Sequence, residues 1–454
     1  MTSPVILWLR QDLRLHDQPA LVAAAGAGPM IPVYVLDDDR PGKWRIGAAQ
    51  RWWLHHSLAA LDDALRHKGS RLILRRGCAS SELRALMAET GATKIHAIRH
   101  YEPWWRKAEE VLGDALCLHD GNHLARVEDI RTGSGTPFKV YSAFWRALSS
   151  QMPPDEPLPM PRTIDAPAHW PESDDLADWS LLPVRPDWAK RFADQWTPGE
   201  DAARKQVSAF ADEVARYEQR RNLPSEQGTS RLSPHLHFGE VSPRHLWHAL
   251  NDHRDSTTFR KELAWRDFAA GVICALPDYA DANGRPKFDQ LPWRSGKAAG
   301  ADLDAWQRGR TGYPIVDAGM RQLWATGWMH NRVRMIAASF LIKHLLIDWR
   351  AGEAWFWDTL VDADYGNNSV NWQWVAGTGV DSNMWERIMA PLVQSVKFDA
   401  AGYIRTWVPE LAGLPDEAIH DPEEAGCRPD RYPPKIIGHR EARERALAAG
   451  RMAR

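Results

Sequence analysis

The stretch MIPVYVL, residues 30–36, is apolar throughout and rich in β-branched side chains. Three comparable runs lie before and after it: PVILWLR (4–10), RLILRRG (71–77) and KIHAIRH (94–100). Helical periodicity fills the intervals between these runs: residues 20–28, 48–69 and 80–92. Strands that are apolar on both faces belong to a parallel sheet that is covered by helices on its two sides. The pattern therefore predicts a doubly wound, Rossmann-like α/β domain over residues 1–130.

Common nucleotide-binding signatures are absent from this α/β segment. GAGPMI (26–31) has no third glycine, and GSGTPF (133–138) does not open a helix after a strand. The chain also has no GxxxxGK sequence followed by Ser or Thr. A doubly wound sheet can bind a ligand where its strand order reverses, but these residues identify none. The missing dinucleotide fingerprint argues against a nicotinamide-dependent oxidoreductase.

The chain changes character after residue 130. We predict an irregular connector over residues 131–200, where prolines interrupt any long helix or interior strand: Pro153, Pro154, Pro157, Pro159, Pro161, Pro167 and Pro171. Strand patterns then fade, and helical periodicity dominates several segments: residues 201–221, 257–276, 314–328 and 331–349. We expect an all-helical domain over residues 201–454. Two of its helices are expected to start at Ser233 and Ser242, where the hydroxyl caps the helix and a proline follows.

Composition narrows the class of protein. A chain of 454 residues is long for one hydrophobic core, so two or three domains are expected. The net charge of −2 gives no overall attraction to nucleic acid, and phosphate contacts would need a local basic patch. The four cysteines form no CxxC pair, which argues against a zinc site and against a disulfide framework. We expect no bound metal, no signal peptide and no membrane span, and therefore a cytoplasmic protein.

Two hydroxyls and a guanidinium precede a predicted helix start in GTSRLSPHL, residues 228–236. The free N–H groups of a helix start, together with such side chains, suit a phosphate or pyrophosphate. A simply capped helix is the alternative. Because Ser242 has the same cap without a preceding Thr-Ser-Arg, capping accounts for Ser233 but not for the rest of the motif. Both interpretations stay open on these residues alone.

The segment WMHNRVRM, residues 328–335, carries polar groups on a predicted helix. Helical spacing places three side chains on one face: Trp328, Asn331 and Met335. The same spacing directs Arg332 and Arg334 elsewhere. Arginines on a core helix need polar partners. An arginine paired with a carboxylate beside an amide can hold a heteroaromatic ring such as a flavin or a base, or it can be purely structural.

Two carboxylates that can pair with Arg334 lie in DADYGNNSVNWQW, residues 362–374. The spacing of Asp362 and Asp364 is similar to that of a calcium loop, but such a loop needs glycine and glutamate where Asn367 and Gln373 stand. The calcium interpretation is therefore disfavoured. A surface loop and the wall of a pocket remain as alternatives.

Two further segments combine charges with aromatic rings. In KELAWRDF, residues 261–268, Glu262 and Arg266 have the spacing of a surface ion pair, which is its commonest meaning. Glu262 together with Trp265 can instead form a place where a base stacks and is hydrogen-bonded. ARYEQRRNLP, residues 215–224, can contact a nucleic-acid backbone, although such a segment is more often a solvated helix end.

Together these segments resemble the cryptochrome/photolyase family over nearly the whole chain. LWLRQDLRLHDQPAL (7–21) resembles the family's N-terminal opening and GTSRLSPHL its flavin-phosphate segment, while residues 309–335 and 362–374 resemble its most diagnostic core. The chain is most similar to bacterial class I or class III photolyases that act on cyclobutane pyrimidine dimers, because Asn331 stands where (6-4) photolyases carry histidine. The resemblance implies an antenna domain and a helical domain that binds folded FAD. UV-damaged DNA is the expected partner of a monomeric enzyme.

The resemblance also implies roles for individual residues. Six are expected to hold the phosphates of FAD: Tyr217, Thr229, Ser230, Arg231, Leu232 and Ser233. Three are expected around the isoalloxazine and ribose: Arg334, Asp362 and Asp364. Asn368 is expected beside flavin N5, where an amide favours a fully reduced, anionic flavin. Six are expected to line the lesion pocket: Glu262, Trp265, Asn331, Arg332, Met335 and Trp374. Arg221 and Gln394 are expected nearer the DNA strand.

The chain has 24 tryptophans, and the family's photochemistry implies a function for some of them. Trp372, Trp349 and Trp293 match the family's electron relay from flavin to surface. Excited, reduced FAD is expected to inject an electron into the dimer, whose ring opens before the electron returns. Glu262 is expected to hydrogen-bond the carbonyl edge of the dimer during this step.

Three alternatives accompany this interpretation. A cryptochrome-type light sensor would share the fold and the FAD site, but Asn368 and the short C-terminal segment favour repair. A (6-4) photolyase is disfavoured by Asn331. The segment MWERIMAPLVQSVKF, residues 384–398, departs from the family's usual sequence and makes lesion details less certain. A second, antenna chromophore, either a reduced folate or a deazaflavin, is expected near residues 43–58 and 100–105, with Glu102 as its one candidate ligand.

Overall fold

A five-stranded parallel sheet forms the N-terminal part of the computed structural model, which describes residues 3–250, 256–382 and 385–452. Its strands are β1 (Val5–Leu9), β2 (Met30–Leu36), β3 (Ile73–Arg76), β4 (Ile95–Ile98) and β5 (Leu116–His119). Their order is β3-β2-β1-β4-β5, and all neighbours are parallel. The predicted α/β class is confirmed. The edge strand β5 escaped prediction because LCLH is half-buried along its length and lacks a continuous apolar run.

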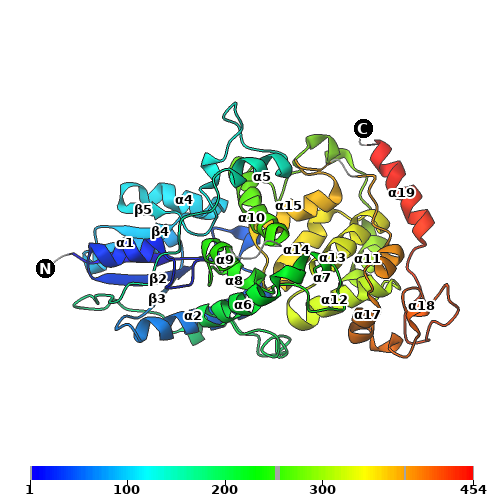
Figure 1. Cartoon of the computed structure of the whole chain (residues 1–454), viewed down its shortest axis with the longest axis horizontal. Coiled ribbons are helices and arrows are strands. Elements are labelled where there is room, and N and C mark those ends of the chain that lie inside the picture. The colour runs from blue at the N-terminus through cyan, green and yellow to red at the C-terminus, as the bar shows by residue number, and fades with distance from the viewer. Residues whose placement is uncertain (1–2, 251–255, 383–384, 453–454) are drawn as a thin grey trace.

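Helices cover both faces of the sheet (Figure 1). Alternate residues of β1 point to opposite sides: Leu7 and Leu9 pack with helices α1 (Pro19–Ala27) and α2 (Ala48–Arg66), while Ile6 and Trp8 pack with α3 (Ala79–Thr90) and α4 (Pro103–Leu112). The structure thus explains why the strands are apolar at every position. Helix α4 was not predicted.

The predicted connector, residues 131–200, contains one α-helix, α5 (Tyr141–Ser149), which packs on α10. The rest of the connector has only short turns, including the 3₁₀ turn Leu176–Trp179, within the described residues. Buried side chains anchor it to the α/β core: Trp179, Phe192 and Trp196. The connector is therefore packed against the core of the α/β part.

Helices make up the remainder, and no further strand occurs in the described residues after β5. The first of these helices in the described residues are α6 (Glu200–Glu213), α7 (Tyr217–Arg220), α8 (Ser233–His237), α9 (Pro243–Ala249), α10 (Thr257–Ala275) and α11 (Gly296–Gln307). Eight follow: α12 (Pro314–Thr326), α13 (Asn331–Ser339), α14 (Trp349–Thr359), α15 (Tyr365–Ala376), α16 (Pro391–Lys397), α17 (Ala401–Trp407), α18 (Asp416–Ile419) and α19 (His439–Met452). The predicted helical class of this part is confirmed.

One predicted helix, residues 331–349, is broken in the structure. Helix α13 ends at Ser339 and continues as a π-helical turn, Phe340–His344. This turn buries Lys343, whose Nζ donates to the carbonyl of Ala376, 2.6 Å away at the end of α15. The chain then passes through Leu346, which has a φ of 52°, before α14 begins. The helix is therefore interrupted where Lys343 is buried, although the helical periodicity of the sequence continues through this region.

The two predicted serine caps differ. The Ser242 hydroxyl accepts a hydrogen bond from the backbone N–H of His245, 3.0 Å away, as expected. Helix α8 begins at Ser233 as predicted, but the predicted cap is wrong, because Leu232 occupies the N-cap position and no side chain caps the helix. The Ser233 hydroxyl instead accepts from Nε1 of Trp328, 3.4 Å away.

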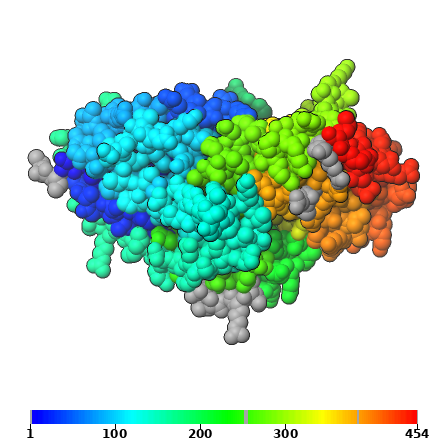
Figure 2. All heavy atoms as spheres, turned by 90° about the horizontal axis from the view of Figure 1, so that it is seen from above, coloured from blue at the N-terminus to red at the C-terminus, as the bar shows by residue number. Residues whose placement is uncertain are grey.

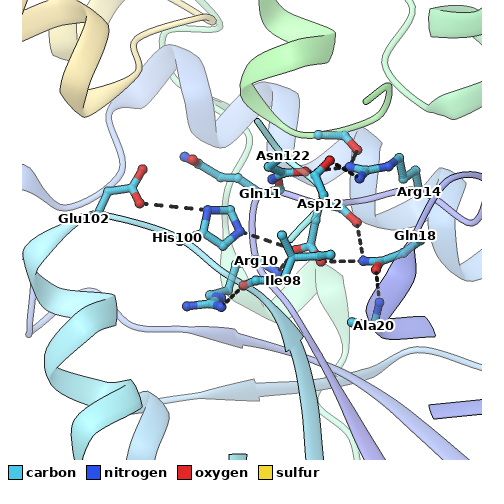
Figure 3. Close-up of polar contacts among 12 residues, drawn as sticks. Arg10, Gln11, Asp12, Arg14, Gln18, Ala20, Ile98, His100, Glu102 and Asn122 are labelled. Atoms are coloured by element: carbon cyan, nitrogen blue, oxygen red, sulfur yellow. Dashed lines mark hydrogen bonds and ion pairs between the residues drawn. The ribbon is translucent and has the colours of Figure 1, made fainter. Parts of the chain in front are cut away.

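A buried polar network joins the sheet to the helical part (Figure 3). Arg14, which is fully buried, donates to the side-chain oxygen of Asn122 at 2.8 Å and to the Gly239 carbonyl at 2.9 Å. Gly239 has a φ of 64°, and a Cβ there would lie 2.1 Å from the carbonyl oxygen of Gln11. The close approach fixes the loop after β1 against the loop after α8. Figure 2 shows the N-terminal and C-terminal residues at opposite ends of the molecule.

Among residues 3–250, 256–382 and 385–452, no helix is both long enough and apolar enough to span a membrane.

Candidate functional site

A cavity of about 800 Å³ opens into the helical part. Its wall is built from segments that are far apart in sequence: α5, the segment 217–237, α10, the segment 328–338, and α14 with α15. The volume falls in the range typical of cofactor sites, about 300–1,000 Å³. Most of the predicted site residues lie on this wall.

Arg334 and Asp362 form a bidentate ion pair on the wall. The two terminal nitrogens of Arg334 donate to Asp362 Oδ1 and Oδ2 at 3.0 and 2.8 Å. Its Nε donates to the carbonyl of Met329 at 2.7 Å, so each of the three guanidinium nitrogens has an acceptor. The prediction that Arg334 points away from the face of Asn331 is wrong, since both residues line the cavity. Two parallel charge-assisted bonds hold the guanidinium in one plane.

Asp364 has a different task from Asp362. Its Oδ1 accepts from the backbone N–H of Asn367 at 2.6 Å and from that residue's amide at 2.8 Å, so it caps α15. Of the two partners considered for Arg334, only Asp362 is used. Residues 362–374 therefore form part of a pocket wall and not a surface loop. Eight of them line the cavity: Asp362, Ala363, Asp364, Asn367, Asn368, Asn371, Trp372 and Trp374.

Asn368 is buried on the cavity side of α15. Its Nδ2 donates to the backbone carbonyl of Glu353, 3.2 Å away on α14. This bond uses one of the two amide N–H groups, so the second N–H and the amide oxygen remain for a ligand. The expected neighbourhood of a flavin N5 is chemically possible here.

Glu262 on α10 is held by two donors. The hydroxyl of Tyr217 donates to Oε2, and Arg221 forms an ion pair with Oε1. Burial raises the pKa of Glu262, while Arg221 and the Tyr217 hydroxyl act in the opposite direction. The ion pair considered between Glu262 and Arg266 does not form, because Arg266 donates to main-chain carbonyls. Tyr217, expected at the phosphates of FAD, therefore contacts the predicted lesion acid.

The segment 229–233 lines the cavity with polar groups. Thr229, Ser230, Arg231 and Ser233 face it, whereas Leu232 is fully buried in the hydrophobic core. The Arg231 guanidinium lies over the indole rings of Trp196 and Trp328, and no carboxylate of the described residues forms an ion pair with it. Burial lowers the pKa of Arg231. A cation without a carboxylate, next to several hydroxyls, suits an anionic group such as a phosphate.

The predicted lesion residues divide into two groups. Trp265, Asn331, Met335 and Trp374 line the cavity together with Glu262. Arg332 does not line it: it donates to Oδ1 of Asn222 at 2.7 Å and lies over the Phe398 ring. Of the two residues expected nearer the DNA strand, Gln394 belongs to α16 outside the cavity wall, whereas Arg221 lines the cavity. Met384, which opens the divergent segment, lies outside the described residues.

The three predicted relay tryptophans are all present in the helical part. Trp372 lines the cavity, and its ring centroid is 4.9 Å from Phe356 and 6.3 Å from Trp306. Trp349 is fully buried, and Trp293 contacts Trp385. Ring contacts among the described residues do not join Trp372, Trp349 and Trp293 into a series, so their relay stays a prediction.

Several cavity residues were missed by sequence reasoning. Tyr141 comes from the connector, and its hydroxyl donates to the carbonyl of Lys261. His237 is buried, which lowers its pKa to about 4. Asn371 follows Asn368 by one helical turn and was predictable from that spacing. Tyr141 and His237 had no such signal, since their positions depend on how the connector and α8 fold back.

Glu102, the predicted antenna ligand, is buried between the two parts. Its carboxyl accepts from the backbone N–H of Tyr101 at 3.1 Å and lies 3.9 Å from His100 (Figure 3). It lines a separate, small cavity with Asp364. Burial and the nearby charge of Asp364 raise the pKa of Glu102 to about 8. An antenna role for Glu102 stays a prediction.

The donor set of the large cavity fits FAD. Arg231 and its neighbouring hydroxyls offer donors for two phosphates, and the planar Arg334–Asp362 pair offers donors and acceptors for a heterocycle. In addition, Nε1 of Trp265 is buried without a hydrogen-bond partner. An orphaned buried donor on a cavity wall indicates a missing acceptor from a ligand.

Known proteins with similar sequences match nearly the whole chain. Residues 5–162 match the family model described as DNA photolyase, and residues 259–452 match the FAD binding domain of DNA photolyase. A deoxyribodipyrimidine photo-lyase of Agrobacterium fabrum is 47% identical over 99% of this chain and 98% of its own length.

Two further proteins define the neighbourhood. The crystal structure of a bacterial class III photolyase from Agrobacterium tumefaciens superimposes with a TM-score of 0.94 and 46% identity, covering 100% of this chain and 98% of that one. Cryptochrome-1 of Arabidopsis thaliana is 36% identical over 97% of this chain and 69% of its own length. The predicted family is confirmed, and the chain belongs to the photolyase/cryptochrome family.

Proposed function

We propose that this protein is an FAD-dependent DNA photolyase that splits cyclobutane pyrimidine dimers in light. The observation that carries the proposal is a single cavity with two chemically distinct parts. One part holds Arg231 and the Arg334–Asp362 pair, and the other holds Glu262 beside Trp265. A carrier of electrons and a damaged base can therefore lie in contact within one enclosed space.

The first part is the FAD site. Arg231, Thr229, Ser230 and Ser233 would hold the phosphates, and Arg334 with Asp362 would hold the heterocyclic end. Reduced FAD, when bound and excited by light, supplies the electron that a ground-state flavin cannot deliver to a dimer. The protein has to orient this group, and Asn368 would do so with its amide oxygen.

The second part receives the dimer after it leaves the duplex. Extrusion costs least at a damaged step, where pairing and stacking are already weak. Trp265 and Trp374 offer ring faces for stacking, and Met335 offers an adaptable apolar contact. Glu262 would hydrogen-bond the polar edge of the dimer while Arg221 and Tyr217 hold its carboxyl group in place. This hydrogen bond from Glu262 would stabilise negative charge on the dimer during ring opening.

Residues outside the cavity would contact the DNA strand. Arg332 and Gln394 lie beyond the cavity wall, and we assign them to the DNA backbone and not to the lesion. Their contribution would fall with increasing salt, because contacts to phosphates release counterions. We further propose that the protein acts as a monomer in the cytoplasm.

The rival function is a cryptochrome-type light sensor that acts through a protein partner. It is favoured by the 36% identity with a plant cryptochrome. An asparagine at position 368 favours repair, since an amide, unlike a carboxylic acid, has no acidic proton to give to flavin N5 and so favours the anionic reduced flavin.

Illumination of the reduced, FAD-loaded protein with an oligonucleotide that contains a single thymine dimer separates the two functions. Repair predicts restored thymines, counted by chromatography, only in the light. A protein that retains FAD and binds the oligonucleotide but restores no thymine would contradict the proposal and favour the sensor.

A further inference from the structure

A second cavity lies between α2 of the α/β part and α6 of the helical part, two helices that lie side by side in Figure 1. Its volume is about 630 Å³, within the range of about 300–1,000 Å³ that is typical of sites for small molecules. Leu61 and Ala64 of α2 and Trp196 of the connector make one side of this cavity apolar. The proposed repair reaction makes no use of it.

Arg231 is the one described residue that lines both the large cavity and the second cavity. Its guanidinium lies 4.3 Å from the centroid of the Trp196 ring and 4.9 Å from that of the Trp328 ring, so two indoles hold it. The guanidinium makes no hydrogen bond and no ion pair with any other group of the described residues. Since it carries five N–H donors, Arg231 can serve an anion in each of the two cavities.

His235 presents a buried polar group to the second cavity. Its side chain is 6% exposed, and its Nδ1 is hydrogen-bonded to Oε2 of Glu240, 2.5 Å away. Glu240 also accepts from Nε1 of Trp53 at 3.0 Å and from the N–H of Gly199 at 2.8 Å, so the carboxylate fixes the imidazole in place. Nε2 of His235 has no hydrogen-bond partner in the part of the chain that the structure describes. A buried side chain with such an atom on a cavity wall indicates a partner supplied by a ligand.

Helix α6 adds a second cation. Lys205 lines the cavity, is exposed, and forms no ion pair with a described residue. Its neighbour Gln206 donates from Nε2 to the carbonyl of Ser230 at 2.9 Å, which ties α6 to the segment that carries Arg231. The cavity therefore has a fixed cation on its inner side and a flexible cation at its mouth.

Two acids on the same wall limit the charge of a ligand. The carboxyl group of Glu200 is occupied, because it accepts from the backbone N–H groups of Leu15 and His16 at 2.7 and 2.9 Å. Asp201 is exposed. Two cations beside two carboxylates suit a ligand with a single phosphate group and disfavour a polyanion such as nucleic acid.

A gap filled only by water is the alternative. Water can satisfy the polar atoms of Arg231 and His235. It does not account for the apolar side, where Leu13, Leu61 and Trp196 are all buried residues of the core that line the same space. An apolar side joined to a cationic side is the arrangement that suits an organic phosphate.

We propose that the cavity between α2 and α6 binds a small phosphate monoester, with the phosphate near Arg231, His235 and Lys205 and the organic part against Leu61 and Trp196. Because Arg231 also lines the large cavity, this ligand and the phosphates of FAD place two anions beside one guanidinium. The two anions repel each other, so each weakens the binding of the other. This coupling rests on the assignment of FAD to the large cavity, whereas the second site does not.

Calorimetric titration of the full-length, FAD-loaded protein tests the site with three probes: adenosine monophosphate (AMP), adenosine and inorganic phosphate. AMP has both a phosphate and an organic part, and it should bind at least about tenfold more tightly than either fragment. Adenosine that binds as tightly as AMP would show that the phosphate is not recognised, and inorganic phosphate that does so would show the same for the organic part. Either result, or no binding of AMP at about 5 mM, overturns the proposal.

Three variants locate the bound AMP. Lys205→Gln should weaken AMP binding about three- to tenfold, because it removes one of the two cations. Arg204→Gln is the matched control and should leave AMP binding unchanged, since Arg204 is the preceding residue of α6 but does not line the cavity. Ala209→Trp, at an exposed position on the same wall, should fill the cavity and abolish AMP binding. Equal AMP affinity in the parent and in the Lys205 and Ala209 variants would place AMP elsewhere and overturn the site.

The coupling is measured as FAD released on dilution, with and without AMP. AMP should raise the apparent dissociation constant of FAD about fivefold or more in the parent protein and leave it unchanged in Ala209→Trp. Equal release with and without bound AMP would reject the shared use of Arg231. Flavin absorbance before each titration shows that FAD is bound, and repair of a thymine dimer by the Ala209→Trp protein is assayed in parallel. Failure of the proposed function is thereby distinguished from failure of the second site.

Discussion

Glu262 illustrates how a single acid is prepared for a ligand. Burial favours its neutral form, while Arg221 and Tyr217 favour the charged form. The two donors also fix the direction of the carboxyl group within the cavity. A side chain in this position is polarised but not free to rotate, which reduces the entropy lost when a dimer binds.

Glu262→Gln should therefore keep FAD and weaken dimer binding by about tenfold, because it removes a charge-assisted hydrogen bond. The measurement is titration of dimer-containing oligonucleotide, with flavin absorbance reporting retained cofactor. Glu226→Gln is a matched control, since Glu226 pairs with an arginine on the surface outside the cavity. Equal affinity of the Glu262 variant and the parent protein would argue against contact with the dimer.

Asp267 is a second buried acid, and it acts on stability instead of binding. Its Oδ2 accepts from the backbone N–H groups of Leu124 and Ala125 at 2.8 and 3.2 Å, while its Oδ1 has no partner. Burial raises the pKa of Asp267 to about 7, although Arg266 and the two N–H groups lower it. The folded chain thus binds a proton that the unfolded chain releases above about pH 4.

Because this pKa is raised on folding, the stability contributed by the proton is complete at low pH and is lost as pH rises from about 4 to about 7. Asp267→Asn should remove this loss. The free energy of unfolding of the variant should therefore exceed that of the parent by about 1–4 kcal/mol between pH 5 and pH 8. Urea unfolding at the two pH values measures it. A difference between variant and parent that does not change with pH would show that Asp267 does not titrate in this range.

At the scale of an element, α15 combines a cap with a binding wall. Asp364 caps its first turn and also faces the cavity. Asp364→Ala should cost about 1 kcal/mol of unfolding free energy through loss of the cap and should also lower FAD affinity. Asp348→Ala is its counterpart, because Asp348 caps α14 with a 3.0 Å bond to the N–H of Arg350 and lies outside the cavity.

The two cap variants are compared by urea unfolding without FAD and by FAD titration. Both should be destabilised to a similar degree, but only the Asp364 variant should bind FAD more weakly. Equal FAD affinity in the two would assign Asp364 to helix capping alone.

Helices and strands with a clear hydrophobic pattern could be predicted from the sequence. Those whose ends depend on a single tertiary contact could not. Strand β2 runs from Met30 to Leu36, as its apolar run predicts, because no neighbour contradicts its local preference. The break after α13 depends on burial of Lys343 against the end of α15, a contact more than thirty residues away. Family resemblance supplied most cavity residues, but the inward direction of Arg334 depends on the carbonyl of Met329.

At the scale of the whole molecule, the relation between the two parts depends on Gly239. Its backbone has a φ of 64°, and a side chain would collide with the backbone of Gln11 and Asp12. Gly239→Ala should therefore lower the unfolding free energy by about 1–3 kcal/mol, through strain and through separation of the two parts.

Gly271→Ala is the comparison for this substitution, since nothing lies within 4 Å of a Cβ built at Gly271. Thermal unfolding should distinguish the two variants, with Gly271→Ala unchanged or slightly more stable because alanine favours a helix. If both variants melted alike, the loop contact at Gly239 would not contribute to stability.

The buried side chain of Arg14 has a further consequence for thermodynamics. Its donors are satisfied by Asp17 and Gly121 on the sheet side and by Gly239 on the helical side. Separation of the two parts would remove the Gly239 acceptor and leave one N–H of this buried guanidinium unpaired, which costs about 1–3 kcal/mol. Separation of the sheet from the helical part is therefore unfavourable, and we expect the two parts to unfold together. Ligand binding in the helical cavity should then also protect the sheet from unfolding.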